Sequence, residues 1–200
     1  MSLALDISHI GESLVAELLN NQAIKEKIKD LAKLSSLPKE AKPNVPISND
    51  SDPMHRIDVL ITGEDNSLTA IEVKFGTTII TPGAYCARYL SNTTDGSTKG
   101  NMINKLIEGV TIENQKIEKK WVLLVRNKKI RKKLSSSAKL GATSKELWEK
   151  MCKNCCIVSL EDLLLGVEED VFETAVKKCL TPLKSFHEDW EVSLSVPSGL

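Results

Sequence analysis

The segment RIDVLITGEDNSLTAIEVKF, residues 56–75, decides the fold that we expect for this chain. Two stretches in it, Ile57–Ile61 and Leu68–Phe75, are rich in β-branched residues, which favour strands. Between them, Gly63–Ser67 has the Gly, Asp, Asn and Ser composition of a turn. The segment is therefore predicted to form a β-hairpin.

The pairing of the two strands follows if the hairpin is symmetric about Asp65. Asp58 then lies opposite Glu72, and Lys74 is on the same face because side chains alternate along a strand. Directly opposed carboxylates lie about 5 Å apart at their Cβ atoms and repel one another. A divalent cation between them would explain the arrangement, and the alternative is a solvated face on which Lys74 neutralises Glu72. Leu60 and Ala70 share this face, and the opposite, apolar face is expected to hold Ile57, Val59, Ile61, Ile71, Val73 and Phe75.

The remaining sequence predicts helices and strands on both sides of the hairpin. Apolar residues recur every three to four positions over residues 5–34, with a break expected at Asn20-Asn21. Residues 35–54 are rich in Pro, Ser and Asn, which favours a loop with only a short strand at Asn44–Ser48. Helices are expected at 83–90, 100–109, 127–134, 144–153, 161–165 and 168–180, and buried strands at 121–125 and 155–160. This order predicts an α/β fold, a three-layer sandwich with a central mixed β-sheet flanked by helices.

Length and composition fit a folded domain without a membrane span. The chain has 200 residues, of which 41% are hydrophobic and 27% charged. No apolar run approaches the roughly 18 residues that a spanning helix needs. The five cysteines and the lack of a signal peptide point to free thiols in a reducing cytoplasm. Cys152 and Cys155 have C-x-x-C spacing, but zinc would need two further ligands, so buried thiols beside a strand are favoured.

A basic segment is hidden within a net charge of zero. Between Lys116 and Lys133 there are nine Lys and Arg residues against one acid. A local basic segment of this kind can bind phosphate, and the alternative is a solvated basic turn. The residues expected at the end of the strand 121–125 are Arg126, Lys128, Lys129, Arg131, Lys132 and Lys133.

The acidic and basic residues of the hairpin resemble the motif of the PD-(D/E)XK nuclease superfamily, which has the restriction-endonuclease-like fold. Asp58 is followed, after thirteen residues, by Glu72-Val73-Lys74, and a helix bearing Glu12 precedes them. The resemblance covers about residues 5–126. The proline that gives the motif its name is missing, because Ile57 precedes Asp58.

The resemblance implies a site for Mg²⁺ or Mn²⁺. Asp58 and Glu72 would be its ligands, with the backbone carbonyl of Val73 as a third oxygen. Lys74 would position or deprotonate the attacking water. Glu12 would complete the site, although the sequence leaves open whether Glu12 or Glu17 is the acid on the helix.

The expected function is that of a Mg²⁺-dependent endonuclease acting on DNA, in its simplest form a restriction-type or defence enzyme that works as a homodimer on double-stranded DNA. The nuclease domain would span residues 1–180, and residues 181–200 would be a weakly patterned tail. Two alternatives stay open. One is an RNA-cleaving or toxin nuclease on the same fold, and the other is a non-catalytic binding protein that keeps the fold.

Overall fold

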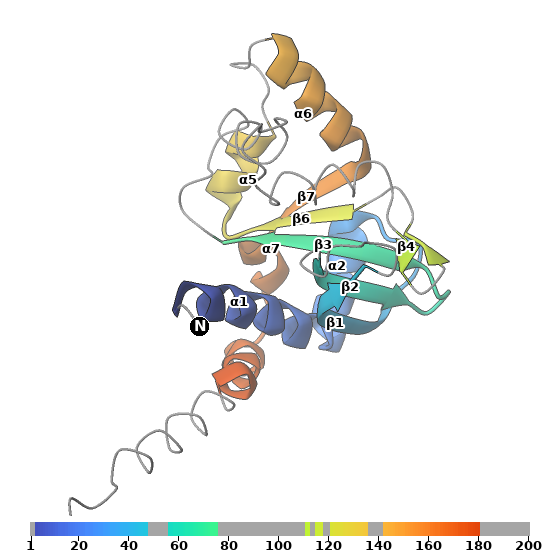
Figure 1. Ribbon diagram of the computed structural model, residues 1–200. Helices are drawn as coiled ribbons and strands as arrows, with labels where there is room; N and C mark the ends of the chain where they lie inside the picture. The colour runs from blue at the N-terminus through green and yellow to red at the C-terminus, as the bar shows by residue number, and fades with distance from the viewer. Residues whose placement is uncertain are drawn as a thin grey trace, which may run out of the picture.

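The fold is built on a five-stranded mixed sheet with helices on both faces (Figure 1). The computed structural model describes residues 3–47, 56–75, 111–112, 115–117, 121–135 and 142–180. The strand order is β1-β2-β3-β6-β7, antiparallel from β1 to β3 and parallel from β3 to β7. The strands are β1 (Pro38–Pro46), β2 (Arg56–Gly63), β3 (Leu68–Lys74), β6 (Trp121–Val125) and β7 (Cys155–Ser159). A separate two-stranded sheet pairs β4 (Thr111–Ile112) with β5 (Gln115–Lys116).

Two hydrophobic clusters, one on each face of the sheet, join the strands to the helices. On one face, α5 (Lys128–Leu134) and α6 (Ala142–Asn154) pack on Leu123 of β6. On the other face, α1 (Leu3–Leu19), α2 (Gln22–Ala32), α7 (Leu160–Leu164) and a helix over residues 169–180 pack on Leu124. All five residues of β6 are buried, as expected for a parallel strand that is covered on both sides. Figure 1 shows α5 and α6 on the opposite side of the sheet from α1 and α7. The predicted α/β architecture with a mixed central sheet is therefore present.

The hairpin has the predicted register from Val59 to Thr62, whereas the predicted pairs Asp58–Glu72 and Ile57–Val73 lie outside the β2–β3 ladder. Val59 pairs with Ile71 and Leu60 with Ala70, as a turn centred on Asp65 requires. Ile57 is an exception, because it belongs to the cluster that contains Leu60 rather than the one that contains Val59. The β2–β3 ladder begins at Val59, so Ile57 lies beyond the part of β2 that the hairpin holds in register.

The expectation of a loop at residues 35–54 was wrong over much of its length. β1 runs for nine residues, from Pro38 to Pro46, although it contains three prolines. Proline cannot donate a ladder hydrogen bond, and an edge strand tolerates it because one row of its backbone groups faces outward. β1 occupies an edge of the sheet, which explains how the strand forms.

The helix boundaries largely agree with the sequence pattern. α1 and α2 are separated at Asn20-Asn21, and the Asn21 side chain caps α2 by accepting a hydrogen bond from the Ala23 amide. Asn127 caps α5 in the same manner through the Ile130 amide. α6 begins at Ala142, two residues earlier than expected. The helices expected at 83–90 and 100–109, and the tail 181–200, lie outside the described residues.

The described residues show neither a membrane span nor a cysteine-based metal centre. None of their helices combines the length and apolarity needed to cross a bilayer. Cys152, Cys155, Cys156 and Cys179 are free thiols. No three His, Cys, Asp or Glu side chains within this part of the chain are grouped so as to hold a metal, so the C-x-x-C pair lacks further ligands there.

Candidate functional site

Asp58, Glu72 and Lys74 lie together where the parallel strands of the sheet end. β3 and β6 run side by side with Lys74 level with Val125, and β7 continues the row with Ser159 level with Val125. The carboxyl ends of β3, β6 and β7 therefore meet at one edge. In open α/β sheets this edge is where ligands bind, because the loops that follow the strands diverge there.

The Lys74 ammonium is surrounded by three oxygens. It contacts Glu72 Oε1, lies 3.4 Å from Asp58 Oδ2, and donates a hydrogen bond to the Val73 carbonyl oxygen at 3.2 Å. The backbone fixes the Asp58 carboxylate, because Oδ2 also accepts a hydrogen bond from the Val73 amide at 2.7 Å. The three residues that the resemblance names as metal ligands thus surround a positively charged group, the Lys74 ammonium.

Glu72 is an unusually placed carboxylate, because only 6% of the residue is exposed. Its Oε2 atom is buried and has no hydrogen-bond partner among the described residues. The pKa of Glu72 is raised from 4.5 to about 7, first by burial and then by the charge of Asp58, while the Lys74 ammonium opposes both effects. The alternative of a solvated charged face is therefore wrong at this position, although Lys74 does neutralise Glu72.

The two acids of the first helix have different surroundings. Glu12 is 8% exposed, and its charge contributes to the raised pKa of Glu72. The neighbouring Gly11 faces the ring of Phe75, the residue after β3, because a Cβ on Gly11 would lie 3.6 Å from that ring. Glu17 instead forms an ion pair with Lys178 of helix 169–180, at 3.1 Å. Of the two acids, Glu12 is therefore the one whose charge reaches Glu72.

The donor set at this edge fits a hard divalent cation. Mg²⁺ binds through one or two carboxylates and keeps several waters, so a group of three acidic side chains is not required. Such a group is not formed among the described residues, where Glu12 acts on Glu72 through its charge. Asp58, Glu72 and the Val73 carbonyl would supply the oxygens, and Oε2 of Glu72, which has no partner among the described residues, could accept a cation.

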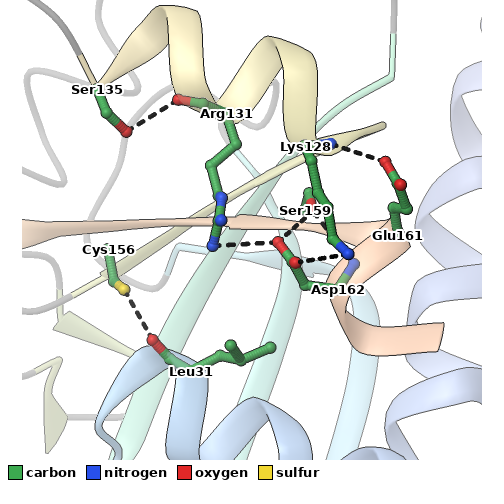
Figure 2. A network of polar contacts seen from close by, with 8 residues as sticks. All are labelled: Leu31, Lys128, Arg131, Ser135, Cys156, Ser159, Glu161 and Asp162. Atoms are coloured by element: carbon green, nitrogen blue, oxygen red, sulfur yellow. Dashed lines mark hydrogen bonds and ion pairs between the residues drawn. The ribbon is translucent and has the colours of Figure 1, made fainter. Parts of the chain in front are cut away.

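The basic segment begins at the same edge. Arg126 follows β6 and is exposed, and so are Lys129, Lys132 and Lys133 of α5. None of these four forms an ion pair with another described residue. Lys128 and Arg131 are different, because both point to Asp162 of α7, as Figure 2 shows.

Asp162 and Ser159, which lie outside the motif, connect the basic segment to β7. Ser159 ends β7, caps α7 and donates a hydrogen bond to the Asp162 carboxylate. The spacing Ser-x-x-Asp over residues 159–162 is that of a capping box, which is a signal in the sequence. The signal marks a helix start, but it does not show that the acid also binds two basic residues from another helix.

Comparison with protein-family models, curated proteins and solved structures finds no match to this chain. The chemistry of the site therefore follows from its own residues. One sheet edge holds the buried Glu72 and the half-buried Asp58 around the Lys74 ammonium, and it lies beside a helix whose exposed basic side chains can bind an anion.

Proposed function

We propose that this protein is a Mg²⁺- or Mn²⁺-dependent endonuclease of the restriction-endonuclease-like fold, and that it hydrolyses phosphodiester bonds in double-stranded DNA. The observation that supports this most directly is the position of the Lys74 ammonium among Asp58 Oδ2, Glu72 Oε1 and the Val73 carbonyl. The Oε2 atom of Glu72, unsatisfied within the described part of the chain, adds to this support.

Each residue of the cluster has a distinct task in this proposal. Asp58 and Glu72, with the Val73 carbonyl, would hold the divalent cation, and the Val73 amide keeps Asp58 oriented. When bound, Mg²⁺ would stabilise charge on the phosphate and lower the pKa of a bound water. Lys74, released from the carboxylates, would orient or deprotonate the attacking water and offset negative charge at phosphorus. Glu12 would tune the charge of the site from α1.

The basic residues supply the expected nucleic-acid contact. Their positions after β6 place them next to the strand that carries Glu72 and Lys74. Lysine and arginine contacts to the phosphate backbone give affinity without sequence preference. The basic segment comprises Arg126, Lys128, Lys129, Arg131, Lys132 and Lys133, of which Lys128 and Arg131 pair with Asp162.

Isothermal titration calorimetry with Mn²⁺ and Mg²⁺ tests the metal site. Wild type is expected to bind, and Asp58→Ala is expected to lose the binding heat because it removes one of two carboxylates. Glu17→Ala is the matched control, because Glu17 is an acid that pairs with Lys178 away from the cluster. Equal binding heats for wild type and Asp58→Ala would contradict the proposal.

The choice of nucleic acid is tested by cleavage. Supercoiled plasmid and structured RNA are incubated with equal amounts of protein in Mg²⁺, and nicking of the plasmid is expected. If only the RNA is cleaved, then RNA and not DNA is the substrate, and the assignment of the metal site is unaffected.

A further inference from the structure

Helix α5 carries two kinds of basic residue. Ile130 and Leu134 are buried and face the sheet. At 3.6 residues per turn, Lys129, Lys132 and Lys133 lie within an arc of about 100° that points away from these two apolar residues. All three are exposed, so this arc is the outer surface of α5.

The remaining two basic residues of α5 face Asp162. Arg131 Nη1 lies 3.1 Å from Asp162 Oδ2, and Lys128 Nζ lies 3.7 Å from Oδ1 (Figure 2). The side chains of Lys128 and Arg131 are 41% and 38% exposed, whereas that of Asp162 is only 11% exposed. The Glu161 carboxylate also accepts a hydrogen bond from the Lys128 amide at 3.0 Å. One half-turn of α7 therefore holds both the side chains and the backbone of α5.

Asp162 itself is fixed to the sheet. It accepts a hydrogen bond from Ser159, which is fully buried at the end of β7, and its amide donates to the Ser159 hydroxyl at 3.2 Å. Ser159 is level with Val125, and Val125 is level with Lys74. Neighbouring strands lie about 4.8 Å apart, so the backbone of Ser159 is about 10 Å from that of Lys74. The contacts that orient α5 therefore start from the same sheet edge that holds the carboxylate cluster.

We propose that Asp162 is a positioning residue: it holds Lys128 and Arg131 so that Arg126, Lys129, Lys132 and Lys133 face the phosphate backbone of a nucleic acid. This inference rests on the proposed function for its partner. It divides the six basic residues into two that orient α5 and four that contact phosphate. A helix of seven residues is marginal by itself, so its orientation depends on such contacts from outside.

The direction in which one substitution changes the affinity for DNA distinguishes a positioning role of Asp162 from a purely electrostatic one. Asp162→Asn removes a negative charge beside a basic helix, and by Coulomb attraction alone it would tighten the binding of an anion. If Asp162 positions α5, the same change weakens binding, although the protein becomes more positive. Asp162→Glu keeps the charge and is expected to restore part of the affinity.

Fluorescence anisotropy with a labelled DNA duplex of mixed sequence measures this in EDTA. We expect Asp162→Asn to bind about fivefold more weakly than wild type, with partial recovery for Asp162→Glu. Equal or tighter binding by Asp162→Asn overturns the proposal, and so does a wild-type protein that does not bind the duplex. No metal is bound at the carboxylate cluster in this assay, and no cleavage takes place. Duplex binding without any metal-dependent cleavage would therefore reject the nuclease function while leaving this inference in place.

The salt dependence of binding provides a second, independent readout. Each phosphate contact contributes about 0.9 to the slope of log K against log salt concentration. Lys132→Gln is expected to reduce the slope by about one, and Arg131→Gln is expected to leave it unchanged. Lys39→Gln, on the exposed part of β1, is the matched control. A reduced slope for Arg131→Gln would make Arg131 a phosphate contact and overturn the division. This comparison decides the proposal even if Asp162→Asn does not fold.

Discussion

Glu72 determines how the carboxylate cluster responds to pH. Its raised pKa, about 7 instead of 4.5, means that the folded protein keeps a proton that the unfolded chain has already lost. The stability that this proton gives is fully present below pH 4.5 and is lost as the pH rises through about 7.

Metal-free wild type is therefore expected to become less stable between pH 5 and pH 8. A pKa rise from 4.5 to about 7 corresponds to about 3 kcal/mol in the free energy of unfolding. Glu72→Gln should remove this dependence and be the more stable protein at pH 8. Urea denaturation in EDTA across this pH range measures it, with Glu64→Gln in the exposed turn as the control. A Glu72→Gln protein with the wild-type pH profile would contradict the assignment.

Lys74 is expected to separate metal binding from catalysis. If the proposed function holds, Lys74→Ala should lower the rate of DNA cleavage by about 100-fold or more, because Lys74 is the group proposed to handle the attacking water. Metal affinity should persist, because Asp58 and Glu72 remain and the ammonium that competes with the metal for their oxygens is gone. Cleavage rates and calorimetry on the same preparation measure both effects, with Lys42→Ala as the control at an exposed ion pair. Full cleavage activity in Lys74→Ala would disprove the role.

The residues of the cluster were predictable because a hairpin register depends only on local order. The symmetry of the turn about Asp65 gives the pairing of Val59 with Ile71, and the structure has it. The burial of Glu72 was not predictable, because it depends on β6 and on the helices that cover the sheet. The ion pairs of Arg131 and Lys128 with Asp162 join residues about thirty positions apart, and local sequence patterns do not report such contacts.

At the scale of elements, the β2–β3 turn is tied to the segment between α2 and β1. The Asp65 carboxylate accepts hydrogen bonds from the hydroxyls of Ser35, Ser36 and Ser67, at 2.8, 2.6 and 2.6 Å. These bonds, with that of Ser36 first, hold the pKa of Asp65 below its usual range. The stabilisation is present above the ordinary carboxylate pKa and is lost as the pH falls.

Asp65→Ala is accordingly expected to lower the melting temperature at pH 7, and the size of this loss should shrink as the pH falls below the usual range of an aspartate. The cause is the loss of a charged acceptor for three serine hydroxyls. Thermal unfolding followed by circular dichroism at pH 7, pH 3 and pH 2 measures the trend, and Glu64→Ala is the neighbouring exposed control. An equal loss at all three pH values would mean that the charge of Asp65 is unimportant.

The elements that the sequence predicted well are those with strong local signals. Asn21 and Asn127 mark the helix starts, and the apolar run Trp121–Val125 marks the buried strand β6. β1 was underestimated because three prolines are typical of a loop, and only its place at an edge of the sheet makes a strand compatible with them. An edge position is a property of the whole sheet, so a local pattern cannot show it.

At the scale of the whole molecule, β6 is the strand on which both helical layers rest. Leu123 belongs to the cluster with α5 and α6, and Leu124 belongs to the cluster with α1 and α2. Both leucines are fully buried. Two adjacent residues thus report on opposite faces of the sheet.

Leu123→Ala and Leu124→Ala are each expected to lower the free energy of unfolding by about 2–5 kcal/mol, because each leaves a cavity in a covered face. Chemical denaturation measures both, and Leu165→Ala, at an exposed position, should have little effect. A small loss for one of the two leucines would show that its face of the sheet is open. The three-layer arrangement would then be reduced to two layers.

The place of the Lys74 ammonium between Asp58 and Glu72 has a practical consequence for handling the protein. Because the chain neutralises its own carboxylates, chelation should stop the proposed cleavage reaction without unfolding the domain, in contrast to proteins that need a structural metal to fold. A complex with intact DNA could then be assembled in EDTA, frozen or crystallised, and started at a chosen moment by adding Mg²⁺.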